Sequence, residues 1–200
     1  MKPRRWWIIG LVLILSAPSA WSEVMKSEKA AFAAGCFWGV EKVFAALPGV
    51  TSTQVGYTGG TVKDPSYELV CTGTTGYAEA IEITYDPSKI SYERLLEYFW
   101  KFHDPTTLNR QGNDVGTQYR SAIFFHTPGQ QQAALHAKEI LDRSGIYKKP
   151  VVTEIKPAGE FYAAEDYHQK YLKKNPNGYC DIHFQSARVS EVLRAARHSA

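Results

Sequence analysis

Apolar and polar positions along the chain predict strands and helices that follow one another closely. An apolar run over residues 30–35 predicts a strand, and apolar side chains at helical spacing from Phe37 to Leu47 predict a helix directly after it. Alternating apolar and polar positions predict strands over residues 50–57 and 78–85. Cys36 therefore lies at the junction of the first strand and the first helix.

The second half of the chain continues this pattern. Its expected elements are a helix capped by Ser91 and running through Phe102, a strand over 121–126, a helix over 129–143, a strand over 151–155 and a helix over 161–174. Long polar loops are expected over residues 59–76 and 103–120, and loops of that length in a compact domain are more often functional than idle. The order β-α-β-β-α-β-α-β-α predicts a single α/β sandwich with helices against a mixed sheet.

Composition fits a globular domain and argues against a nucleic-acid partner. The chain has 200 residues, of which 44% are hydrophobic and 22% charged, and its formal net charge is +3. Lys2, Arg4 and Arg5 supply three of the 23 basic residues, so the rest of the chain carries 20 basic and 20 acidic residues. A folded domain without a basic excess lacks the electrostatic footprint of a nucleic-acid binder.

Residues 1–22 resemble a secretory signal peptide, with a basic start, an apolar run and a small-residue exit. The apolar run is shorter than the ~20 residues of a membrane span, and Pro18 breaks it. We expect cleavage after Ser22 rather than after Ala20, although an uncleaved anchor stays open. The mature domain would then cover residues 23–200. It would be periplasmic or secreted and would not associate stably with a membrane.

The chain has three cysteines, Cys36, Cys71 and Cys180. In an oxidising compartment an odd number leaves at least one thiol free or cycling. Three widely spaced cysteines in a chain that can build its own core are weak evidence for a disulfide framework. Redox or nucleophilic chemistry is therefore the leading interpretation.

Cys36 has the surroundings expected of a reactive sulfur. The free amides and positive end of the predicted helix favour a thiolate over a thiol. Gly35 and Gly39 allow a tight turn and a close approach of a ligand, while Phe37 and Trp38 offer apolar walls. The segment GCFWG thus predicts a nucleophile in an aromatic pocket.

GCFWG is also the active-site signature of the A-type peptide methionine sulfoxide reductases, which the chain resembles from about residue 29 to 184. The segments that match in the same order are GYTGG at 56–60, TGYAEA at 75–80, HDP at 103–105, QGNDVGTQYRS at 111–121 and NPNGYC at 175–180. The resemblance implies a two-layer α/β sandwich of the ferredoxin-like plait type with a long irregular C-terminal stretch. It also implies reduction of the S epimer of methionine sulfoxide, free or in proteins, with no cofactor or metal ion.

Reduction of a sulfoxide requires a thiolate that attacks sulfur and an acid that protonates the departing oxygen. Cys36 supplies the first group. Glu79 shares a strand face with Ile81 and Ile83, and apolar surroundings would favour its neutral form. By periodicity alone an exposed glutamate is the more common outcome, so the match to the family's catalytic glutamate assigns Glu79 as the acid.

The resemblance implies further roles around the substrate. Tyr67 and Tyr119 match residues that hydrogen-bond the substrate oxygen, and Asp114 matches one that helps to hold the sulfoxide. Phe37 and Trp38 match the wall that receives the methyl group, which suits an aromatic surface because it cannot hydrogen-bond.

The resemblance also assigns the remaining thiols. Cys180 matches the resolving cysteine, which would close a disulfide with the sulfenic acid on Cys36. Cys71 matches a position that catalysis does not require. A thioredoxin-like donor in the exported compartment would then reduce the disulfide.

Other interpretations compete with this one. A Cys-His protease would pair Cys36 with His103 or His168. Cys180 and His183 form a C-x-x-H pair, but a zinc site needs two more ligands and none is apparent. A non-catalytic binding module with an aromatic groove would show no turnover.

Overall fold

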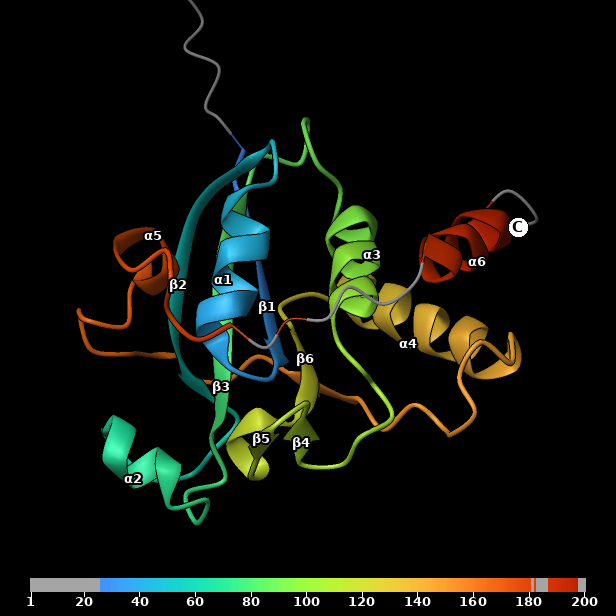
Figure 1. Cartoon of the computed structure of the whole chain (residues 1–200). Coiled ribbons are helices and arrows are strands. Elements are labelled where there is room, and N and C mark those ends of the chain that lie inside the picture. Colours follow the sequence, from blue (N-terminus) through green and yellow to red (C-terminus); the bar gives the residue numbers. More distant parts are fainter. Residues whose placement is uncertain (1–25, 181, 183–186, 198–200) are drawn as a thin grey trace, which may run out of the picture.

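A mixed sheet of six strands forms the centre of this computed structural model, which describes residues 26–180, 182 and 187–197 (Figure 1). The strands lie in the order β7-β6-β1-β3-β2-β8. Their bounds are β1 (Glu28–Ala34), β2 (Val50–Thr58), β3 (Ala78–Tyr85), β6 (Ser121–Phe125), β7 (Glu154–Pro157) and β8 (Tyr162–Ala163). Neighbouring strands are antiparallel except β6 and β7, which are parallel, so the mixed sheet is confirmed.

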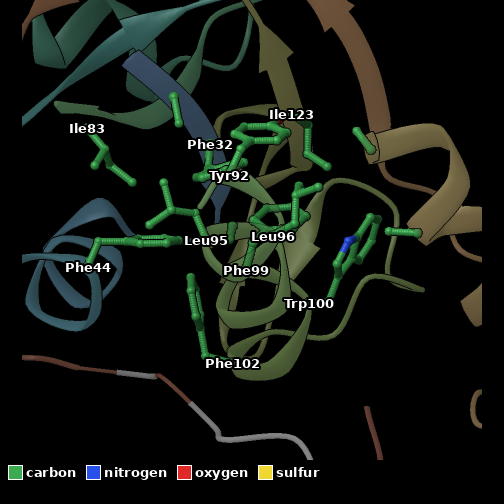
Figure 2. Close-up of a cluster of buried hydrophobic side chains, with 14 of the residues drawn as sticks. Phe32, Phe44, Ile83, Tyr92, Leu95, Leu96, Phe99, Trp100, Phe102 and Ile123 are labelled. Carbon is green, nitrogen blue, oxygen red and sulfur yellow. The ribbon is translucent and has the colours of Figure 1, made fainter. Parts of the chain in front are cut away.

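Helices pack on one face of this sheet. The longer ones are α1 (Phe37–Ala45), α3 (Tyr92–Phe102), α4 (Pro128–Arg143) and α6 (Ala187–Arg197). The Phe32 ring from β1 stacks on Phe44 of α1 at 5.3 Å and on Phe99 of α3 at 5.1 Å, between ring centroids (Figure 2). Burying an aromatic or branched side chain of this size stabilises the fold by roughly 1.5–3 kcal/mol. This cluster therefore fixes α1 and α3 against the strands.

The opposite face of the sheet carries small side chains. Its buried positions on the central strands are Ala31, Ala33, Ala78, Ala80, Ala122 and Phe124. Ala158 and Phe161 pack against them, and the Ala164 amide bonds to the Val55 carbonyl at 2.9 Å. Small residues thus let the segment after β7 lie directly on the sheet.

Most predicted elements agree with the structure. The first strand and helix, the strands that begin at Val50 and Ala78, and the strand from Ser121 lie where the pattern placed them. The helix capped by Ser91 is confirmed, because the Ser91 Oγ accepts the Arg94 amide at 3.3 Å. The strand expected over 151–155 lies three residues later, at β7.

The helix predicted over 161–174 is wrong. Residues 162–163 form the edge strand β8, and only α5 (Tyr171–Lys174) is helical at the end of this range. Lys170 has a φ of 53°, a left-handed conformation that a continuous helix excludes. Long-range hydrogen bonds from Glu165 and Gln169 hold the segment against β2 and α2 (Tyr67–Cys71) instead.

Both long polar loops contain short elements that the sequence pattern did not indicate. The first loop contains α2, and the second contains the hairpin of β4 (Arg110–Gln111) and β5 (Asp114–Val115), followed by the 3-10 helix η1 (Thr117–Tyr119). These elements carry Tyr67, Asp114 and Tyr119.

The predicted irregular C-terminal stretch is confirmed in part: residues 158–180 contain only the short elements β8 and α5, but the last described part of the chain is the helix α6. Val189 and Leu193 of α6 are buried in the main core. The buried Glu97 of α3 pairs with Arg194 at 2.8 Å and with Arg197 at 3.1 Å. The apolar contacts of α6 with the core and its ion pairs with α3 thus stabilise a helix where coil was expected.

Residues 1–22, the predicted signal peptide, lie outside the described residues. Within the ranges that the structure describes, none of the helices combines the length and the apolar character that crossing a membrane requires.

Candidate active site

Cys36 lies at the N-cap of α1 and directly follows Gly35, the residue that separates it from the end of β1. Gly35 has a φ of +91°, and a Cβ there would come within 2.8 Å of the Gln111 side chain, so this turn requires glycine. The Cys36 side chain makes no capping hydrogen bond to α1. The residue is half-buried, and its sulfur lies at the start of α1 near the amides of Trp38 and Gly39.

The ionisation of Cys36 differs from the expectation. The amides of Trp38 and Gly39 lower its pKa, as a helix start should, but burial and the nearby Glu79 carboxylate raise it by more. The net pKa is well above that of a free thiol. The expected resting thiolate is thus wrong, because desolvation outweighs the two amides.

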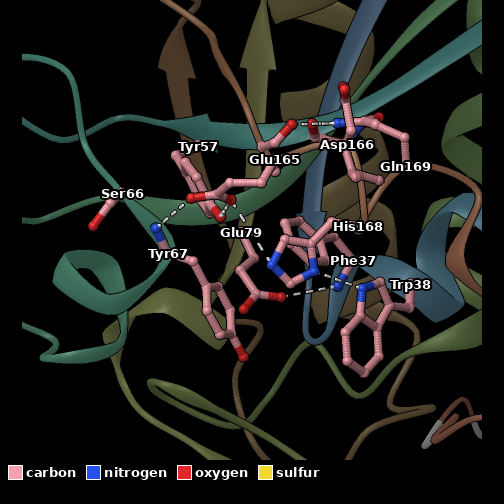
Figure 3. Close-up of polar contacts among 12 residues, drawn as sticks. Phe37, Trp38, Tyr57, Ser66, Tyr67, Glu79, Glu165, Asp166, His168 and Gln169 are labelled. Atoms are coloured by element: carbon pink, nitrogen blue, oxygen red, sulfur yellow. Dashed lines mark hydrogen bonds and ion pairs between the residues drawn. The ribbon is translucent and has the colours of Figure 1, made fainter.

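Glu79 is buried on β3, with 2% of its surface exposed, on the same face as Ile81 and Ile83. Its Oε2 accepts the backbone amide of Phe37 at 3.1 Å (Figure 3). Burial raises the pKa of Glu79 to about 8, with a further increase from Asp114, while the Phe37 amide opposes the shift. The carboxyl is therefore mostly protonated at neutral pH and can donate a proton beside Cys36.

Two tyrosine hydroxyls share the surroundings of this carboxyl. Tyr67 is the first residue of α2, and burial together with a hydrogen bond to the Cys71 side chain raises its pKa. Burial and the charge of Glu79 raise the pKa of Tyr119, the last residue of η1. Both hydroxyls keep their protons near neutral pH and remain hydrogen-bond donors.

Asp114 lies at the start of β5, where the β4–β5 hairpin carries it towards the same site. Its carboxylate raises the pKa values of Cys36 and Glu79. The Tyr179 hydroxyl donates to Oδ1 of Asp114 at 3.0 Å. This bond joins the hairpin to the residue before Cys180.

Aromatic rings form a fixed wall beside the sulfur. The Phe37 ring, 1% exposed, lies 5.0 Å from His168 between centroids, and Trp38 stacks on Tyr171 at 3.8 Å. The Trp38 indole Nε1 donates to Nδ1 of His168 at 2.9 Å (Figure 3). The wall is thus held from behind by residues of the 161–174 segment.

The two other cysteines lie on the edges of this site. Cys180 is exposed, and its Sγ lies 3.4 Å from the position that a Cβ on Gly39 would occupy. Cys71 is exposed at the end of α2 and bonds with Tyr67. The thiol predicted to resolve therefore lies at the first turn of the helix that Cys36 caps.

The sequence pattern did not indicate two residues that hold the segment 161–174 against the rest of the site. Glu165 accepts the Tyr57 hydroxyl and the Tyr67 amide, each at 2.9 Å. The Gln169 side chain bonds both the amide and the carbonyl of Val55. Their polar side chains are ordinary for a helix surface, so nothing local in the sequence indicates these roles.

The competing interpretations gain no support. His103 is buried, bonds Phe99 O at 2.7 Å and Ser121 Oγ at 2.8 Å, and burial lowers its pKa to about 4. His168 accepts the Trp38 indole at Nδ1 and its Nε2 has no hydrogen-bond partner, so neither ring is hydrogen-bonded to Cys36 in the part of the chain that the structure describes. That part also contains no cluster of three His, Cys, Asp or Glu side chains able to hold a metal ion, and His183 lies outside it.

Comparison with known proteins decides the family. A family model for peptide methionine sulfoxide reductase matches residues 28–199. The chain belongs to this family. Its predicted resemblance to the reductases is thereby confirmed, and the chain is an oxidoreductase of the methionine sulfoxide reductase type.

Individual relatives agree with this assignment. The peptide methionine sulfoxide reductase MsrA of Methanoculleus marisnigri is 57% identical over 153 residues, covering 76% of this chain and 93% of the relative. The MsrA of Geobacter sulfurreducens is 55% identical over 153 residues, covering 76% and 94%.

Solved structures give the same result for the fold. Reduced Mxr1 from Saccharomyces cerevisiae is similar with a TM-score of 0.76 and 37% identity, covering 80% of this chain and 93% of that one. Methionine sulfoxide reductase A of Corynebacterium diphtheriae has a TM-score of 0.66 and 42% identity, covering 77% of both chains.

Proposed function

We propose that the chain reduces the S epimer of methionine sulfoxide, free or in proteins, with Cys36 as nucleophile and Glu79 as acid. The observation that carries this proposal is the 3.1 Å hydrogen bond from the Phe37 amide to Glu79. It holds a carboxyl with a raised pKa against the backbone next to the thiol. A nucleophile and a proton donor can then act on the sulfur and the oxygen of one sulfoxide group.

The first step transfers oxygen from the substrate to Cys36. The sulfur of Cys36 attacks the sulfoxide sulfur while Glu79 gives its proton to the sulfoxide oxygen, and the Cys36 thiol proton replaces the one that Glu79 gave. The sulfur–oxygen bond of the substrate then breaks as the protonated oxygen passes to the Cys36 sulfur, the bond formed between the two sulfur atoms breaks, and methionine leaves. The substrate gains two electrons and Cys36 becomes a sulfenic acid.

The pocket suits the three substituents on the sulfoxide sulfur. The Tyr67 and Tyr119 hydroxyls donate to the oxygen, and Asp114 helps to hold the group. Phe37 and Trp38 receive the methyl group, which has no hydrogen-bonding capacity. Because these groups are fixed around one chiral centre, only one epimer presents its oxygen to Glu79.

The second step returns Cys36 towards its reduced state. The Cys180 thiol attacks the sulfenic sulfur, water leaves, and a Cys36–Cys180 disulfide forms. A dithiol donor of the thioredoxin class then reduces this disulfide by exchange. A solved structure of yeast Mxr1 contains Mxr1 in complex with Trx2, which supports this class of donor.

We further propose that residues 1–22 direct export, so that the enzyme repairs oxidised proteins of the periplasm or the exterior and draws on a donor there. The segment's basic start, apolar run and small-residue exit support this.

We also assign the fold to the ferredoxin-like plait type, supported by the strand order β6-β1-β3-β2 with α1 and α3 as crossovers.

One assay tests the activity. Separated S and R epimers of an N-blocked methionine sulfoxide are incubated with the protein and dithiothreitol, and methionine is quantified, with Cys36→Ser as the control. We expect the parent to consume the S epimer alone and Cys36→Ser to consume neither. Equal consumption of both epimers, or turnover by Cys36→Ser, would contradict the proposal, and no turnover by the parent would favour a binding module.

A further inference from the structure

Gly39 forms a notch in the first turn of α1 that the C-terminal segment fills. A Cβ on Gly39 would lie 2.7 Å from both Cγ1 and Cδ1 of Ile182 and 3.4 Å from Sγ of Cys180. Real Cβ atoms do not approach carbon atoms that closely, so any larger residue at position 39 would force the end of the Ile182 side chain out of its present place. Gly39 is buried in consequence, although its helix borders the site.

The segment that carries Cys180 is held at its other end too. The Gly178 amide bonds Asn175 O at 2.9 Å, and a Cβ on Gly178 would come within 2.8 Å of the Tyr171 ring. Ile182 is half-buried against the main core. Cys180, itself exposed, therefore lies between two contacts on α5 and α1.

We propose that Gly39 is a positioning residue for the resolving step: its notch seats Ile182 and thereby holds Cys180 beside the helix start that carries Cys36. This inference rests on the proposed function, in which the Cys180 thiol attacks the Cys36 sulfenic acid. Holding two reacting groups together raises their effective concentration, and misplacement by about 1 Å can cost roughly 100-fold in rate. The notch acts on disulfide closure and not on oxygen transfer, in which Glu79 is the proposed acid.

Alanine at position 39 fills the notch and leaves the amide that faces the sulfur in place. Gly129 provides a matched control, because it lies in the first turn of α4 and a Cβ there meets nothing closer than 3.8 Å. Gly129→Ala gains the same helix propensity without displacing a neighbour. Ile182→Ala empties the notch from the other side and does not alter α1.

The test is a single turnover without reductant on Gly39→Ala, Ile182→Ala, the double variant, Gly129→Ala and the parent. Methionine release is followed by chromatography, the sulfenic acid by trapping with dimedone, and the Cys36–Cys180 disulfide by quenched mass spectrometry. We expect Ile182→Ala to release methionine at the parental rate but to close the disulfide roughly 10- to 100-fold more slowly, and Gly39→Ala to show the same slowing of closure relative to its own rate of methionine release. Gly129→Ala should match the parent in both steps.

The double variant decides whether the two residues act through one contact. We expect it to close the disulfide no more slowly than the slower single variant, since both changes remove the same seat. Slowing equal to the product of the two singles, or closure by both singles within about twofold of the parent, would overturn the inference. A parent that releases no methionine would instead contradict the proposed function, so the two failures are distinguishable.

Discussion

The indole Nε1 of Trp38 donates a hydrogen bond to Nδ1 of His168 at 2.9 Å, across 130 residues of sequence. An acceptor at Nδ1 requires that nitrogen to be unprotonated, and burial lowers the pKa of His168 below its usual value. The imidazole is thus neutral near pH 7. Its ring also lies 4.5 Å from Tyr67, between centroids, so one residue contacts both Trp38 and Tyr67, which we propose line the substrate pocket.

His168→Leu should weaken substrate binding more than it slows disulfide closure. It leaves the Trp38 N–H without its acceptor, and losing about 1 kcal/mol of hydrogen bonding corresponds to roughly a fivefold rise in KM. His168→Asn, whose side-chain oxygen can accept from the indole, should recover part of the loss. Steady-state kinetics on the S epimer give the KM of both variants, and quenched mass spectrometry gives their rate of disulfide closure. An unchanged KM in His168→Leu would show that Trp38 is held without this hydrogen bond.

Local signals in the sequence suffice where an element depends on its own residues. Ser91 caps α3 through the Arg94 amide, and the apolar spacing after it indicates the buried side of that helix. The alternation around Glu79 likewise predicts its shared face with Ile81. The family motif was needed both for the burial of Glu79, since periodicity alone favours an exposed side chain, and for its chemical role.

Contacts between distant residues could not be read from the sequence. The segment 161–174 has the composition of a helix, yet Glu165 bonds Tyr67 and Tyr57, which lie 98 and 108 residues earlier. Such tertiary bonds outweigh local helix propensity, which is worth only a fraction of a kcal/mol per residue. The resting protonation of Cys36 was missed for the same reason, because Glu79 and the burial come from the assembled fold.

Glu79→Gln should slow formation of the sulfenic acid by about 100- to 10,000-fold, the usual contribution of a positioned acid. Glutamine keeps the shape and can still accept the Phe37 amide, but it has no proton to give. Methionine release in a single turnover measures the effect. A rate within about tenfold of the parent would move the role of the acid elsewhere, with Asp114 as the next candidate.

The same carboxyl predicts a pH dependence. The pKa of Glu79 is raised to about 8, so its protonated, active form is lost as pH rises through that value. We expect the rate of oxygen transfer in the parent to fall above about pH 8.

The same raised pKa predicts a pH dependence of stability. The stability that a raised carboxyl pKa contributes is present below the unfolded value of 4.5 and is lost as pH rises towards 8. Urea titrations of parent and Glu79→Gln at pH 5 and pH 9 should show that only the parent loses this part of its free energy of unfolding.

Tyr67→Phe and Tyr119→Phe should each slow oxygen transfer less than Glu79→Gln does. Either hydroxyl can partly replace the other as a donor to the sulfoxide oxygen, so the double change should cost more than the two single changes combined. Such non-additivity is expected of neighbours that serve one group. Single-turnover rates for the four proteins complete the cycle, and strictly additive losses would mean that the two hydroxyls act at separate points.

Replacing each remaining thiol separates its role from that of Cys36. Cys180→Ser should release about one methionine per chain and then stall with a thioredoxin as the only reductant, because the sulfenic acid has no partner thiol. Cys71→Ser should cycle at the parental rate, since the serine hydroxyl can still hydrogen-bond the Tyr67 hydroxyl. Cys71→Ala removes that hydrogen bond and should slow oxygen transfer while leaving disulfide closure unchanged. Mass spectrometry of the parent after one turnover should find residues 36 and 180 joined. A bridge between 36 and 71, together with continued cycling of Cys180→Ser, would reverse the roles of the two thiols.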